Sequence, residues 1–130
     1  MRAILAALLV SAPAAAQTTL RADETFHRSA AAGQEMRVFT YGGYHRDCSP
    51  LPPPQAVLRT LPAHGSVSIR PAPAAIRMTR EGGTPCIGIT VPGTVVFYTP
   101  AAGFHGADQF DWTVTTVRAT AHDAAVVDVQ

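Results

Sequence analysis

The fold is decided by one stretch of the chain, residues 94–115, which reads TVVFYTPAAGFHGADQFDWTVT. Residues 94–99 are β-branched or aromatic on both faces, which is typical of a strand in the centre of a sheet. Further on, Phe110, Trp112 and Val114 alternate with polar residues at the two-residue period of a strand. The stretch therefore predicts two neighbouring strands joined by a short connection that contains glycine.

This connection has the composition of a tight corner. Pro100 ends the first strand because it has no backbone N–H, while Gly103 and Gly106 allow a sharp crossing between two sheets. Asp108 is expected to accept hydrogen bonds from nearby backbone N–H groups and so to hold the corner. We interpret the motif as a folding element, not as an active site. The predicted corner comprises Pro100, Gly103, Gly106, Asp108, Phe110 and Trp112.

Alternating hydrophobic residues recur along the rest of the chain, and helical periodicity is hard to find. The chain has 130 residues, 47% of them hydrophobic, which suits one folded domain with a core. Pro71 and Pro73 are expected to interrupt strand pairing, and Pro92-Gly93 to form a tight turn between strands. We predict an all-β, antiparallel β-sandwich of about seven to nine strands. The predicted strands are 26–29, 36–41, 56–60, 67–69, 87–91, 94–99, 110–116 and 124–129, and a short helix within 19–32 is the alternative to the first.

The N-terminal segment has the three parts of a secretory signal peptide. Arg2 is followed by the apolar run Ala3–Val10 and then by small residues, so we place cleavage before Gln17. An N-terminal core helix is the alternative interpretation. Residues 1–16 are thus predicted to be removed, which leaves 17–130 as a single domain that is periplasmic or secreted, without membrane insertion.

The charge balance argues against nucleic acid as a partner. The chain has ten basic and nine acidic residues, a formal net charge of +1. Without Arg2, the mature chain has nine of each and is neutral. We therefore expect no electrostatic steering of the whole domain toward phosphates or anionic lipid.

Export changes the interpretation of the two cysteines, Cys48 and Cys86. In an oxidising compartment, such a pair usually forms a disulfide. The two residues are 38 positions apart. A bridge across that span stabilises a small domain by roughly 4 kcal/mol in the chain-entropy model. A metal ligand and a free thiol are the alternatives.

Three motifs give the chain a family resemblance. Residues 62–69 read PAHGSVSI, residues 98–100 read YTP and residues 106–112 read GADQFDW. In this order they resemble the bacterial Ig-like, cadherin-like tandem repeats of surface and secreted adhesins, which carry Pro-x-x-Gly-x-Val, Tyr-x-Pro and Gly-x-Asp-x-Phe-x-Tyr. Trp112 stands in place of the last Tyr, a longer insertion contains Cys86, and one domain replaces the usual string of repeats. The resemblance implies an Ig-like fold and a binding role, but not calcium, because the acidic motifs of cadherin linkers are missing.

No motif in the chain predicts catalysis, and we expect a noncatalytic protein without a cofactor. The chain has no Gly-x-Ser-x-Gly elbow, glycine-rich phosphate loop or His-Glu-x-x-His sequence. The five histidines lack the local spacing of metal ligands, but antiparallel pairing would bring His64 and His105 to one end of the sandwich. A periplasmic copper or zinc site at these two residues is the alternative function. The simpler interpretation is that both histidines are turn residues.

The segment 41–48, YGGYHRDC, is the best candidate for partner recognition. Tyr41, Tyr44, His45 and Arg46 are its candidate binding residues. Tyrosine and arginine are frequent where partners bind. The alternative is that the tyrosines cover the edge of the core. We predict an exported module that binds a protein or glycan of the cell envelope or has a structural role there, with an inhibitor of a secreted enzyme as a further alternative.

The intact mass of the protein after export from a bacterial host tests the signal peptide and the bridge together. We expect a chain that begins at Gln17 and is lighter than its reduced form by the two thiol hydrogens. A chain that retains residues 1–16, or one that gains no mass on reduction, would contradict the corresponding prediction. Extra mass equal to a metal ion under native conditions would favour the histidine site.

Overall fold

The computed structural model describes residues 22–77 and 85–130. These residues form seven β-strands and the connections between them. The predicted signal peptide and its cleavage site lie outside the described residues. Those residues form no helix, and hence none with the length and hydropathy of a membrane span. The strands are β1 (Glu24–Ala30), β2 (Met36–Tyr41), β3 (Gln55–Thr60), β4 (Gly65–Ala75), β5 (Thr90–Pro100), β6 (Gly106–Thr115) and β7 (Thr120–Val129).

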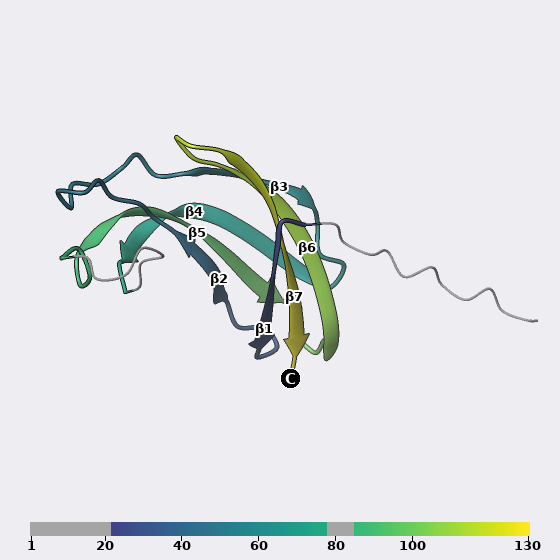
Figure 1. Ribbon diagram of the computed structural model, residues 1–130. Helices are drawn as coiled ribbons and strands as arrows, with labels where there is room; N and C mark the ends of the chain where they lie inside the picture. The colour runs from purple at the N-terminus through teal and green to yellow at the C-terminus, as the bar shows by residue number, and fades with distance from the viewer. Residues whose placement is uncertain (1–21, 78–84) are drawn as a thin grey trace, which may run out of the picture.

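The strands form two sheets that pack face to face (Figure 1). One sheet has four strands in the order β1-β7-β6-β3, and the other has three in the order β2-β5-β4. The chain crosses between the sheets after β1, β2, β3 and β5, which is the connectivity of an Ig-like β-sandwich. The prediction of an all-β, Ig-like sandwich is confirmed, with seven strands in the described residues.

The first strand departs from the antiparallel prediction. β1 pairs with β7 in parallel, with Phe26 opposite Ala125, while the other four strand pairs are antiparallel. Parallel neighbours need a long crossover connection, and here the whole domain lies between the first strand and the last. Between the two alternatives for this segment, the structure shows a strand and not a helix, with Phe26 and Ala30 buried.

The core lies between the sheets and is lined by alternate residues of their central strands. Tyr98 of β5 and Phe110 and Trp112 of β6 are the largest fully buried side chains. The rings of Tyr98 and Phe110 stack with centroids 5.4 Å apart, and those of Phe26 and Phe39 with centroids 4.2 Å apart. Aromatic burial on this scale supplies much of the hydrophobic free energy of a small domain.

The corner between β5 and β6 is held by a buried carboxylate. Asp108 accepts hydrogen bonds from the backbone N–H groups of Ala63 and His64, each at 3.0 Å, and from the Tyr98 hydroxyl at 2.6 Å. The two glycines of the corner have φ angles of 80° and 128°, a region that glycine enters without steric cost. One side chain thus ties the β3–β4 connection to both β5 and β6.

The prediction that Pro71 and Pro73 interrupt strand pairing is wrong. β4 continues through both residues, which lie opposite Thr94 and Pro92 of β5. β4 is an edge strand of its sheet. Proline is tolerated there because its missing N–H can face away from the neighbouring strand.

The predicted turn at Pro92-Gly93 is also wrong, since β5 runs unbroken through both residues. A Cβ on Gly93 would lie 2.5 Å from the carbonyl oxygen of Tyr41, so this glycine permits a close approach between strands. Pro92 lies beyond the last residue of β2 that pairs with β5, where a missing N–H breaks no pairing. The strand predicted over 87–91 correspondingly begins only at Thr90.

Asp108→Ala is expected to lower the free energy of unfolding by about 3 kcal/mol, because a buried hydroxyl and two backbone N–H groups lose their acceptor. Urea denaturation at neutral pH measures the loss. Asp128→Ala, which removes an exposed carboxylate from β7, is the matched control and should change the value by less than about 0.5 kcal/mol. Equal losses in the two variants would show that Asp108 does not hold the corner.

Candidate functional site

The candidate site lies at one end of the sandwich, where a disulfide joins two connections (Figure 1). The predicted bridge between Cys48 and Cys86 is confirmed, with their Cα atoms 5.3 Å apart. We call this end the bridged end and the other the opposite end. The bridged end comprises the connections 42–54, 76–89 (described at 76–77 and 85–89) and 116–119, and the opposite end comprises 31–35, 61–64 and 101–105.

The β2–β3 connection is ordered by its own hydrogen bonds. The His45 N–H donates to the Ser49 carbonyl at 2.8 Å, and the Cys48 N–H donates to the His45 carbonyl at 2.9 Å. The hydroxyl and the N–H of Ser49 both donate to the Asp47 carboxylate, and these bonds hold the pKa of Asp47 below its ordinary value. The segment is therefore a fixed turn that presents its side chains in a defined arrangement.

A small apolar cluster, separate from the main core, supports this turn. β4 and β5 extend beyond the last pair between β5 and β2, and their ends build the cluster. The Ile76 N–H donates to the Ile89 carbonyl at 2.9 Å, and the Gly88 N–H donates to the Ile76 carbonyl at 2.8 Å. The cluster comprises buried Ala74, Ile76 and Val91, with Tyr44 and Ile89 packed against them.

The four predicted recognition residues do not share one environment. His45 and Arg46 are exposed at the bridged end. Tyr44 is half-buried, since its ring packs against the small cluster. Tyr41 is the last residue of β2 and packs against the main core instead. The structure thus places three of the four residues at the surface of the turn and the fourth beneath it.

Tyr41 joins the two sheets beneath the bridged end. Its hydroxyl accepts a hydrogen bond from Trp112 Nε1 at 2.9 Å and donates one to the Asp123 carboxylate. Asp123 is 5% exposed and lies directly opposite Trp112 in the β6–β7 pair. Burial and the bond to Asp123 raise the pKa of Tyr41 above its ordinary value. Tyr41 therefore positions the start of the β2–β3 connection.

Two buried carboxylates have roles that the strand pattern does not reveal. Asp123 faces the core from β7, and the core-facing positions that follow it in this strand are apolar. A carboxylate at an otherwise apolar position is the sequence feature that could have identified it as a functional residue. Asp111 accepts a hydrogen bond from the Thr60 N–H at 2.7 Å and lies 2.7 Å from His122 Nε2. Burial opposes ionisation of Asp111, but the bonds from Thr60 and His122 outweigh it and hold its pKa below the ordinary value.

The two histidines of the predicted metal site lie in connections at the opposite end. Both side chains are exposed, and the His64 ring stacks on Phe104 with centroids 4.1 Å apart. Across residues 22–77 and 85–130, no three His, Cys, Asp or Glu side chains are grouped so as to hold a metal ion. A copper or zinc site at His64 and His105 stays a prediction.

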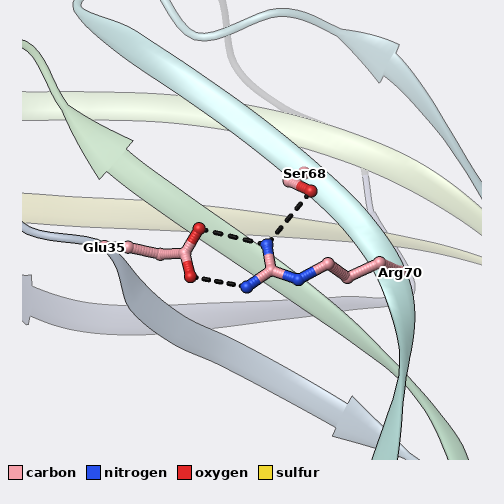
Figure 2. A network of polar contacts seen from close by, with 3 residues as sticks. All are labelled: Glu35, Ser68 and Arg70. Atoms are coloured by element: carbon pink, nitrogen blue, oxygen red, sulfur yellow. Dashed lines mark hydrogen bonds and ion pairs between the residues drawn. The ribbon is translucent and has the colours of Figure 1, made fainter.

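An ion pair braces the outer face of the three-stranded sheet. Figure 2 shows Arg70 of β4 between Glu35 and Ser68. Its guanidinium donates to the two carboxylate oxygens of Glu35 at 3.0 and 2.6 Å, which holds the pKa of Glu35 below its ordinary value. The guanidinium carbon also lies 3.6 Å from the ring centroid of Phe97. These contacts connect the β1–β2 connection to β4 across β5. The guanidinium of Arg70 is therefore already paired within the domain.

The raised pKa of Tyr41 predicts a loss of stability at alkaline pH. Because the folded-state pKa lies above the ordinary value of about 10, the contribution of the phenol is fully present below about pH 10. It is lost progressively as the pH rises from there through the folded-state pKa. The free energy of unfolding in urea should therefore fall as the pH rises above about 10, and less steeply in Tyr41→Phe. A pH dependence that the substitution leaves unchanged would contradict the hydrogen-bonded role of this hydroxyl.

No known protein-family model matches the chain, and no curated protein matches it at a significant level. The likeness to adhesin repeats therefore rests on the motifs in the sequence and stays a prediction. The Ig-like fold rests on the observed strand order. Function is argued below from the geometry of the bridged end.

Proposed function

We propose that the protein is an exported, noncatalytic Ig-like module that binds a protein or glycan of the cell envelope through its bridged end. The observation that carries the proposal is the ordered β2–β3 connection, which the disulfide and the small cluster hold while His45 and Arg46 stay exposed. Binding residues are frequently found on loops that a rigid scaffold positions. A loop that is ordered before binding loses less conformational entropy when the partner arrives.

The proposed location has two supports. A disulfide between Cys48 and Cys86 is consistent with an oxidising compartment. The sequence of residues 1–16 independently predicts a secretory signal peptide. Together they favour the periplasm or the extracellular space, where an adhesin-like binding domain would meet its partner.

The chemistry of the exposed residues also supports a binding role. Arginine and tyrosine contribute disproportionately to binding free energy because each combines a large contact area with directional hydrogen bonds. Arg46 is exposed, and the half-buried Tyr44 beside it has its ring supported by the cluster. Since an Ig-like fold carries many functions, the proposal depends on this surface and not on the fold.

Affinity capture from the envelope fraction of the source organism tests the proposal. The oxidised protein is expected to retain a partner, and His45→Ala with Arg46→Ala should reduce the captured amount by roughly fivefold or more, as loss of an interface anchor does. Both residues are exposed and lie outside the cluster, so the variant should keep the stability of the wild type. Thermal unfolding checks that requirement.

Arg59→Ala is the matched control, because Arg59 is an exposed arginine on β3, away from the bridged end. Its capture should equal that of the wild type. Capture that both variants retain in full, or that both lose equally, would remove the bridged end as the binding surface.

A further inference from the structure

The charges of the domain are segregated between the bridged end and the rest. The described residues include seven Arg and eight Asp or Glu. Three of the arginines, Arg46, Arg77 and Arg118, lie in the bridged-end connections with a single acid, Asp47. The described bridged-end connections therefore have a formal side-chain charge of +2, and the other described residues have −3. Two of these other acids, Asp23 and Glu24, lie just before and at the start of β1, which runs parallel to β7 and begins toward the same end.

The three arginines of the bridged end are available to a partner. All three are exposed, and among the described residues the ion pairs formed by arginine involve Arg70 alone. The neighbouring Asp47, whose charge is included in the +2, forms no ion pair with them among the described residues, and one of its carboxylate oxygens accepts both hydrogen bonds from Ser49 within the turn. A locally positive surface thus exists on a domain that is nearly neutral as a whole.

Two links hold Arg46, Arg77 and Ile87 on the same part of this surface. The disulfide joins the residue two positions after Arg46 to the residue just before Ile87. The N–H just after Ile87 donates at 2.8 Å to the carbonyl of the residue just before Arg77. Ile87 is 51% exposed, so an aliphatic side chain lies at the surface between two guanidinium-bearing segments.

We propose that this surface binds an acidic protein segment, with carboxylates that pair with Arg46 and Arg77 and an aliphatic side chain that covers Ile87. The inference rests on the proposed function and names the chemistry of its partner. Guanidinium groups match carboxylates in charge and in hydrogen-bonding geometry. Ile87 gains free energy only when apolar surface covers it, and a protein side chain supplies that surface where a hydroxylated sugar supplies little.

An exposed aliphatic side chain beside an arginine also favours a protein over an anionic glycan at the β6–β7 connection. Val117, beside Arg118 in the β6–β7 connection, is 64% exposed. The bridged end therefore repeats the combination of an exposed aliphatic side chain and an unpaired arginine. A partner that carries both acidic and aliphatic residues would complement both places.

Nitrogen-15 NMR of the oxidised protein, titrated with a peptide of alternating Glu and Leu, tests the proposal. At low salt, the peptide should shift the amide signals of residues 45–47, 77 and 86–88. Raising the salt to about 0.3 M should weaken binding roughly tenfold, since exposed charges are screened. A Gln/Leu peptide of the same length tests the need for charge, and polygalacturonate tests an anionic glycan.

Charge-reversed variants locate the interaction. Arg46→Glu with Arg77→Glu should weaken peptide binding by about tenfold or more, whereas Arg59→Glu on β3 should leave it unchanged. Absent shifts, shifts outside the bridged end, equal binding of the Gln/Leu peptide, or equal binding of polygalacturonate would each overturn the proposal. If the envelope partner is captured through His45 and Arg46 but its binding is insensitive to salt and to Arg77→Glu alone, the acidic-partner inference fails while the binding module stands.

Discussion

Two aspartates in the core each depend on a tyrosine from the opposite sheet. Asp108 of the four-stranded sheet accepts a hydrogen bond from the hydroxyl of Tyr98, and Asp123 of the same sheet accepts one from the hydroxyl of Tyr41. Both carboxylates are 5% exposed, so water cannot replace these donors. A buried carboxylate without donors is strongly unfavourable. The observed packing of the two sheets brings each tyrosine to its own aspartate, and both hydrogen bonds favour this arrangement.

The hydrogen bond between Tyr41 and Asp123 also helps to position the proposed binding surface. Because Tyr41 is the last residue of β2, its bond to Asp123 determines where the β2–β3 connection leaves the sandwich. The disulfide at Cys48 then determines where the turn meets the β4–β5 connection. The short segment between these two anchors carries Tyr44, His45 and Arg46. The two anchors fix the conformation of this segment. The side chains of His45 and Arg46, which neither anchor uses, remain exposed to solvent.

Some properties of the domain could be read from residues that interact locally. The two-residue alternation in 110–114 predicts a half-buried strand, and the glycines near Asp108 predict a corner, because both depend on near neighbours in the chain. The prolines show the limit of this reasoning. Pro71 and Pro73 break a strand only where the neighbouring strand needs their N–H, and whether β4 lies at an edge is a property of the sheet.

The sequence by itself determined the all-β class, the corner motif, the candidate loop and the pair of cysteines, because periodicity, turn chemistry and residue type act over short distances. Only the tertiary structure decided which tyrosine lies inside and which lies at the surface, since Tyr41 and Tyr44 share one short glycine-containing segment. It also decided that Asp123 belongs to the core and that three exposed arginines lie in the connections at one end. These features depend on residues far apart in the chain, and the strand order alone brings them together.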